Sequence, residues 1–242
     1  MRRCLTMLLL GLAVLTGGCA TRVPLDAQAA ASVQRLGVVT PALPDGPTSL
    51  LRHSPGLHFG LAGGIADALL QLERQRQLRA ALESRGFDVR VRWAAMLEEA
   101  LRGAGFAVVT VPAPRPETRF LAAYPTAEVD AFLDIVLVSY GYQAAHIAAP
   151  FQPHARIRAR LATPAGRTLM EEEFQVGPDS PLGFGDLTFV ASGTRHAFAR
   201  SGEAVENPDR VVAGVEEAMA TVSRLIAGAL RPAPPTAVAA AR

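Results

Sequence analysis

The sequence contains no lysine, and its charges almost cancel. All 24 of its Lys and Arg residues are arginine, against 22 acidic residues, so the formal net charge is only +2. Arg2 and Arg3 account for this excess, and the rest of the chain is neutral. Proteins that bind nucleic acid through its phosphates usually carry a basic patch or stripe. The composition therefore gives no support to nucleic-acid binding.

Cysteine is almost absent too, and this limits metal and disulfide chemistry. The two cysteines, Cys4 and Cys19, both lie at the N-terminal end of the chain. The remaining sequence can therefore form no disulfide and no cysteine metal site of its own. A zinc site needs three or four ligands at compatible spacing, and no H-E-x-x-H helix is present. We expect no metal and no cofactor. The five histidines are His53, His58, His146, His154 and His196, and we interpret His53 and His58, five apart in a Gly/Pro-rich stretch, as loop residues.

Long apolar runs are limited to one, Cys4 to Leu15. It is shorter than the roughly 20 residues of a membrane-spanning helix. Its length is typical of the apolar region of a secretory signal, about 7–15 residues. Two arginines precede the run, and the small residues Thr16, Gly17 and Gly18 follow it, directly before Cys19.

This order of charge, apolar run, small residues and cysteine resembles the lipobox of bacterial lipoproteins. The resemblance implies that signal peptidase II cleaves between Gly18 and Cys19, and that Cys19 becomes a diacylglycerol cysteine carrying fatty acids such as palmitate. It implies an outer-membrane protein anchored by lipid with its domain in the periplasm. The inner membrane and the cell surface remain alternative locations, and an ordinary signal peptide or an uncleaved anchor remains an alternative reading.

The rest of the chain divides into three segments. Residues 19–34 are polar and alanine-rich, which predicts a lipidated cysteine followed by a flexible tether. Residues 35–231 are expected to form one periplasmic α/β domain, because a chain that is 50% hydrophobic can fill a sizeable core. Residues 232–242 contain three prolines and predict a disordered tail.

Three helices are predicted from apolar spacing. In residues 88–103 the apolar positions recur at i, i+3, i+4 and i+7 from Trp93, and Gly103 and Gly105 follow. A second helix starts with Asn207 as N-cap and runs to about Leu230. A third, residues 65–84, has an apolar first half and a charged second half that we expect to be solvated.

Strands are predicted at residues 36–39, 106–111 and 132–143, followed by a hairpin. In the hairpin the residues Ala155 to Leu161 alternate between apolar side chains and arginine. With a tight turn at 165–166, Arg160 faces Glu171 and Arg158 faces Glu173, so the arginines are paired and are not an anion site. Together these elements predict an α/β (α+β) fold, a mixed, partly antiparallel sheet with about three helices packed on it.

Catalytic motifs are missing. Ser192, His196 and Asp186 lie near one another in sequence without a G-x-S-x-G elbow, and Asp130 and Asp134 flank a strand start. The glycine-rich GLHFGLAGG lacks both the P-loop lysine and the Rossmann spacing. We therefore predict that the protein is not an enzyme.

Residues 49–64 are predicted to form a long loop with its own apolar side chains. Such loops are uncommon in compact domains and are often functional. The side chains fold back onto the core or form an interaction surface for a partner or membrane. The candidate interaction residues are Leu50, Leu51, Leu57, Phe59 and Leu61.

The stretch from FLDIVLVSYGYQ to RTLMEEEF, together with the preceding GAGFAVV, resembles the α/β domain of the curli-secretion lipoproteins and of the amino-terminal domain of the Tol-system propeller protein. This resemblance implies a non-catalytic binding, assembly or transport-accessory factor with an envelope protein partner. Two alternatives stay open. One is a lipid-anchored hydrolase using His196 or His58, and the other is a carrier of apolar ligands for an ABC-type lipid transport system.

Overall fold

A single seven-stranded sheet organises the chain. The computed structural model describes residues 22–54, 56, 60–115, 117–178 and 187–231. The strand order is β3-β1-β4-β5-β6-β7, with β2 pairing with β4 beside β1. The β4–β5 and β5–β6 pairs are antiparallel, and the other pairs are parallel. The strands are β1 (Arg35–Val39), β2 (Thr48–His53), β3 (Ala107–Val111), β4 (Ala131–His146), β5 (Gln152–Ala162), β6 (Thr168–Gly177) and β7 (Leu187–Ala191).

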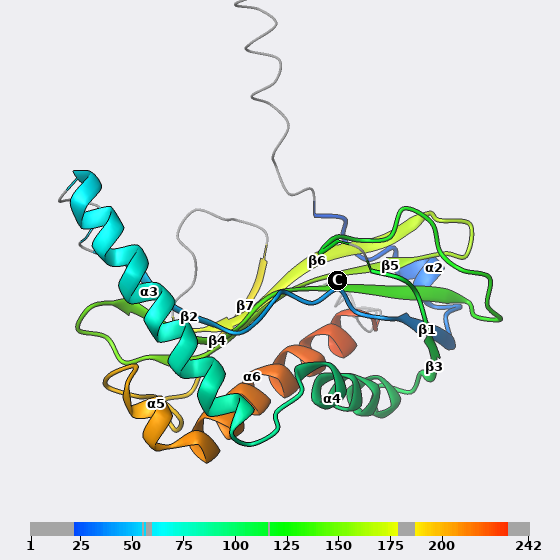
Figure 1. Ribbon diagram of the computed structural model, residues 1–242. Helices are drawn as coiled ribbons and strands as arrows, with labels where there is room; N and C mark the ends of the chain where they lie inside the picture. Colours follow the sequence, from blue (N-terminus) through cyan, green and yellow to red (C-terminus); the bar gives the residue numbers. More distant parts are fainter. Residues whose placement is uncertain (1–21, 55, 57–59, 116, 179–186, 232–242) are drawn as a thin grey trace, which may run out of the picture.

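Helices cover one face of this sheet (Figure 1). The described helices are α2 (Ala27–Ala30), α3 (Gly60–Glu83), α4 (Val89–Gly103), α5 (Glu203–Glu206) and α6 (Pro208–Ala229). In Figure 1, α4, α5, α6 and the C-terminal half of α3 lie below the sheet. The mixed, partly antiparallel sheet and its single helical layer confirm the predicted α/β fold and the single domain.

The two most regular helices pack through the apolar faces that their spacing predicts. In α4 the side chains of Trp93, Leu97 and Leu101 are buried, and Asp88 caps the helix by accepting from the Arg90 amide. Trp93 Nε1 donates to Ser223 Oγ of α6 at 3.2 Å. The buried apolar residues of α6 include Val211, Val215, Met219, Val222 and Ile226.

The hairpin register is confirmed over most of its length. Arg158 pairs with Glu173 and Arg160 with Glu171 along the backbone of β5 and β6. The turn is wider than predicted, because the Thr163 amide donates to the Arg167 carbonyl and the register shifts after Leu161.

The predicted long loop, residues 49–64, is wrong for most of its length. Residues up to His53 belong to β2, which pairs with β4, and residues from Gly60 onward belong to α3. The parallel pairing of β2 with β4 joins residues about 90 positions apart, so the local sequence gives no sign of it. The connection between β2 and α3 is therefore shorter than the predicted loop.

Much of the predicted tether packs against the sheet. Residues 19–21 lie outside the described residues, but from Arg22 onward the chain is held in place. The Val23 amide and carbonyl exchange two hydrogen bonds with Glu171, both 2.9 Å, and Ala30 of α2 is buried. Because this segment has backbone partners on β6, residues 22–34 are part of the folded domain, which is therefore not limited to residues from 35 onward.

Candidate interaction surface

The N-terminal half of α3 projects beyond the body of the molecule. In Figure 1 the helix passes the edge of the sheet beside β2 and rises above it at the upper left. Its C-terminal half contributes Leu78, Ala81 and Leu82 to the core. The prediction that the second half of this helix is solvated is therefore wrong in part, because that half carries the buried residues, whereas the apolar first half is exposed.

The side of this half that faces the protein is polar. Asp67 Oδ1 accepts from Ser54 Oγ at 2.5 Å, and Gln71 donates its side-chain amide to the Ser49 carbonyl of β2. Gly63 and Gly64 are also partly covered. Small and hydrogen-bonding residues hold the helix against β2 here, and no leucine or isoleucine of this half is buried.

The exposed positions of residues 60–72 hold apolar residues throughout, and we call this surface the apolar arc. Leu61 is 83% exposed and Leu69 is 63% exposed. Isolated exposed leucines are common on protein surfaces, but a contiguous apolar surface marks an interaction site. The apolar arc comprises Gly60, Leu61, Ala62, Ile65, Ala66, Ala68, Leu69, Leu70 and Leu72.

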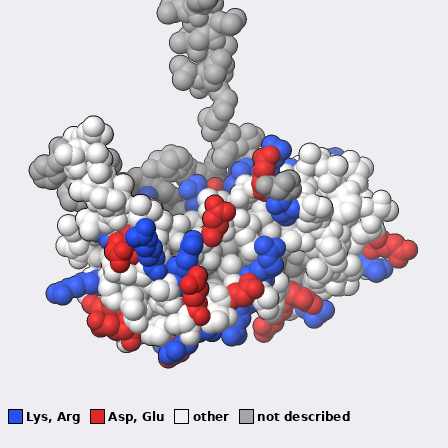
Figure 2. Space-filling model, viewed as in Figure 1, with Lys and Arg blue, Asp and Glu red and all other residues white. Residues whose placement is uncertain are grey.

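Charged side chains are absent from this end in the space-filling view. Figure 2 shows the projecting end of α3 in white, whereas blue and red side chains alternate over the helical layer below. Within 60–72 the only charged residue is Asp67, which faces inward. The exposed side chains of this surface are therefore all apolar.

The residues predicted for the interaction loop are only partly at this surface. Leu61 lies in the apolar arc, and Leu50 of β2 is 42% exposed. Leu51 is wrong as a surface residue, because successive residues of a strand face opposite sides and its side chain joins the core. Leu57 and Phe59 lie outside the described residues, as do Gly18 and Cys19.

Sequence reasoning missed four exposed residues of the arc. From the sequence, the first half of this helix is recognised only as apolar, through Ile65, Leu69 and Leu72, and Leu70 has no predicted role. A usable signal was present. The only polar residues of this stretch, Asp67 and Gln71, are four apart and so share one face that must meet protein or water.

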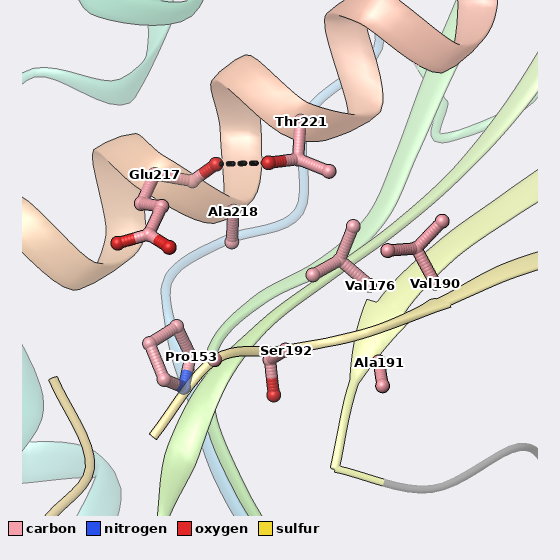
Figure 3. Close-up of a pocket in the computed structure, with 9 residues that line it drawn as sticks. Pro153, Val176, Val190, Ala191, Ser192, Glu217, Ala218 and Thr221 are labelled. Carbon is pink, nitrogen blue, oxygen red and sulfur yellow. Dashed lines mark hydrogen bonds between the residues drawn. The ribbon is translucent and has the colours of Figure 1, made fainter. Parts of the chain in front are cut away.

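A small pocket lies between α6 and the β7 end, near the predicted serine and histidine (Figure 3). Its volume is about 100 Å³, and its walls include Val176, Val190 and Ala218. The Ser192 hydroxyl points away from α6 and donates to Gln152 Oε1 at 2.9 Å (Figure 3). His196 Nε2 instead pairs with Glu217 Oε2 at 3.1 Å. The two side chains have different partners, and Asp186 lies outside the described residues.

The predicted pair of aspartates is not a site either. Asp130 accepts the backbone amides of Gln34 and Arg35 at 2.9 and 2.7 Å, which lowers its pKa. Asp134 is fully buried and bound to Arg115. Four residues along a strand span about 13 Å, so the two carboxylates do not converge.

The remaining polar candidates have structural partners. His154 is buried and hydrogen-bonds to Ser139 Oγ and the Val176 carbonyl, and His53 bonds to the Ala145 carbonyl. His58 lies outside the described residues. Across the described part of the chain, no three His, Cys, Asp or Glu side chains gather closely enough to hold a metal ion.

The three arginines of the β5 row are all paired with two carboxylates of β6. Arg160 pairs with Glu171 at 2.8 Å as predicted, whereas Arg158 reaches the same carboxylate and Arg156 reaches Glu173. The guanidinium groups of Arg158 and Arg160 also lie over the Phe120 ring, 4.9 and 4.2 Å from its centroid.

Comparisons with known proteins give little further information. No family model matches the chain, and no curated protein matches its sequence. The solved structures that are similar to this chain include the protein XCC0632 from Xanthomonas campestris, described by the family model DUF330. The alignment has 14% sequence identity and a TM-score of 0.38, and it covers 81% of this chain and 86% of that one. At this TM-score the likeness carries no argument about function.

Proposed function

We propose that the protein is a lipid-anchored envelope protein that acts by binding and not by catalysis, with the apolar arc of α3 as its contact surface. The single observation that carries this proposal is the orientation of α3, which turns polar residues toward its own domain and apolar residues away from it. The lipobox-like sequence before Cys19 supports the anchor and the envelope location.

The magnitude of the apolar exposure supports a binding role. Five large side chains of the arc are each at least half exposed: Leu61, Ile65, Leu69, Leu70 and Leu72. Full burial of a leucine or isoleucine contributes about 1.5–3 kcal/mol, so covering each remaining half contributes about 1 kcal/mol. A partner that covers all five therefore gains roughly 5 kcal/mol, which is enough to hold a protein already kept nearby by its anchor.

The alternative functions receive less support from the described residues. A hydrolase needs a nucleophile within hydrogen-bond reach of its base, and Ser192 and His196 bind other groups. A carrier of apolar ligands needs a pocket of about 300–1,000 Å³. Two pockets lined by described residues have volumes of about 100 and 50 Å³, both below this range.

The anchor is tested by the intact mass of protein extracted from membranes, with Cys19→Ala beside the wild type. We expect the wild-type mass to correspond to cleavage before Cys19 plus acyl chains, and the variant to lack them. A wild-type chain without lipid would overturn the anchored part of the proposal.

The contact surface is tested by a photo-crosslinking amino acid placed at Leu69 in cells. Val91 of α4 is a matched control, because its side chain is 64% exposed and lies on another helix. We expect Leu69 to give a defined crosslinked product, to lipid or to one protein, and Val91 to give none. Equal, diffuse labelling at both positions would contradict a binding role for the arc.

A further inference from the structure

We propose that the partner of the apolar arc is the lipid bilayer itself, with the N-terminal half of α3 buried in the interfacial layer of the membrane that holds the anchor. This inference depends on the proposed lipid anchor at Cys19 and specifies the partner that the proposed function leaves open. Four features of the described residues favour lipid over a protein partner.

The first feature is the width of the arc. At 100° per residue, the exposed positions from Ala68 through Leu61 and Leu69 to Leu70 span about 200° of the helix circumference. A helix that pairs with a second copy or another helix needs only a narrow stripe along one seam. Lipid surrounds a helix on every side that the protein leaves uncovered, so an apolar surface this wide fits lipid.

The second feature is the short link between the anchor and the folded domain. Val23 is fixed to Glu171 by two backbone hydrogen bonds, and Arg22 Nη2 contacts Glu172 Oε1 at 3.0 Å. Only four peptide units separate Cys19 from Val23, a reach of at most about 14 Å. A lipidated Cys19 therefore keeps this part of β6 close to the bilayer surface.

The third feature is the shared side of the molecule. In Figure 1 the described chain begins above the sheet, on the side opposite α4 and α6, and the N-terminal half of α3 rises on that same side. A bilayer that receives the anchor thus faces the projecting end of α3. The helical layer faces away from it.

The fourth feature is the change in chemistry one turn beyond Leu72. The outward positions that continue the arc along the helix include Glu73, Arg76 and Arg79, all exposed, and Arg76 pairs with Glu73 at 3.9 Å. Arginines at the end of an apolar segment are favourable at the level of the phosphate groups. Residues 60–72 extend about 20 Å along the helix axis, less than the roughly 30 Å hydrocarbon core. None of the described helices has the length and apolar character to cross a bilayer, so insertion is interfacial.

The test uses the mature full-length lipoprotein, purified from membranes and reconstituted into phosphatidylethanolamine and phosphatidylglycerol vesicles. With Cys4 removed and Cys19 acylated, the protein has no free thiol, so one introduced cysteine carries one fluorophore. Labels are placed at Leu61→Cys and Leu69→Cys, with Val91→Cys and Val205→Cys as exposed controls. A nitroxide on the lipid acyl chain is the quencher.

We expect acyl-chain nitroxide to quench the labels at 61 and 69 by about twofold, because an interfacial helix is buried roughly 5–10 Å deep. The controls should lose almost no fluorescence. If the vesicles carry the protein while the labels at 61 and 69 remain unquenched, the bilayer proposal is overturned and the anchor stands. If the unsubstituted protein takes up label at Cys19, the proposed anchor itself fails.

Discussion

Asp134 joins a long surface segment to the middle of the sheet. Its side chain is fully buried, and it pairs with the nearly buried Arg115 and accepts the Leu121 amide at 2.7 Å. Arg115 Nε also donates to the Thr40 carbonyl at 2.6 Å. The Asp134 carboxylate thereby holds the segment of Arg115 and Leu121 directly, and the segment of Thr40 through Arg115.

Removing the Asp134 carboxylate should strongly destabilise the fold. Asp134→Ala leaves the Arg115 charge buried without its partner, and we expect a loss of about 3–5 kcal/mol in the free energy of unfolding. Denaturant titration monitored at Trp93 measures it. The matched control is Glu117→Ala, which breaks the exposed Arg119–Glu117 pair and should cost under about 1 kcal/mol. Equal losses would contradict the role of Asp134.

His154 makes the stability depend on pH. Burial lowers its pKa from 6.5 to about 4, and the nearby Arg156 and Arg52 act in the same direction. Because the unfolded chain takes up the proton first as the pH falls, the histidine's contribution is complete above about pH 6.5 and is lost toward pH 4. By linkage the loss is roughly 3 kcal/mol.

The measurement is the free energy of unfolding from pH 7 to pH 4.5 for the wild type and His154→Asn. The asparagine amide can still donate to the Val176 carbonyl but does not titrate. We expect the variant to be less stable at pH 7 and its stability to fall less steeply with acid. Parallel curves would show that His154 does not titrate on unfolding.

At the scale of the element, β4 contains one position that only glycine fits. Gly141 has a φ of +133°, and a Cβ atom there would lie 2.2 Å from the Thr48 carbonyl oxygen of β2. Gly141→Ala should therefore destabilise the fold by about 2–4 kcal/mol, measured by thermal unfolding. Gly228→Ala in α6 is the control, because nothing lies near its added methyl and helix propensity improves by about 0.5–1 kcal/mol. A neutral Gly141→Ala would show that the β2–β4 pairing relaxes easily.

A leucine-to-glutamine substitution should change the free energy of unfolding little in the N-terminal half of α3 and strongly in its C-terminal half. Leu69→Gln alters a side chain that is 63% exposed and should change stability by about 0.5 kcal/mol or less. Leu78→Gln places an amide in the core, where Leu78 is 2% exposed, and should cost about 3 kcal/mol or more. Circular dichroism during denaturation measures both. A large loss from Leu69→Gln would mean that the arc packs on the domain.

The sequence predicts those helices and strands in which the spacing of apolar residues matches the face that is buried in the structure. The spacing of Val211 and Val215 marks the buried face of α6, and the alternation of Arg158 with Ile157 sets the hairpin register. Strand β2 and the Arg115–Asp134 pair depend on residues about 20 to 90 positions away, so no local pattern indicates them. The exposure of the apolar arc is not predicted either, because the spacing of apolar residues gives the position of a helix face and not what covers it.

At the scale of the whole molecule, the short link after Cys19 and the projecting α3 act together. A binding surface linked to an anchored chain has an effective concentration at the bilayer that falls roughly as the −3/2 power of linker length. The link of four peptide units from Cys19 to Val23 thus keeps the apolar arc at high effective concentration near lipid. Burial of the apolar arc in lipid can therefore hold α3 at the membrane even where the same burial is too weak to bind an unanchored protein.

This coupling gives a final prediction. Inserting 20 Gly/Ser residues between Ala20 and Thr21 should lower the effective concentration of the arc at the bilayer by about tenfold. Acyl-chain quenching of a label at Leu69→Cys should then decrease, while the protein stays in the vesicle fraction through Cys19. The same insertion after Arg231, at the other end of the domain, should leave the quenching unchanged. If the N-terminal insertion also leaves it unchanged, α3 binds lipid without help from the short link, and the anchor does not position the domain.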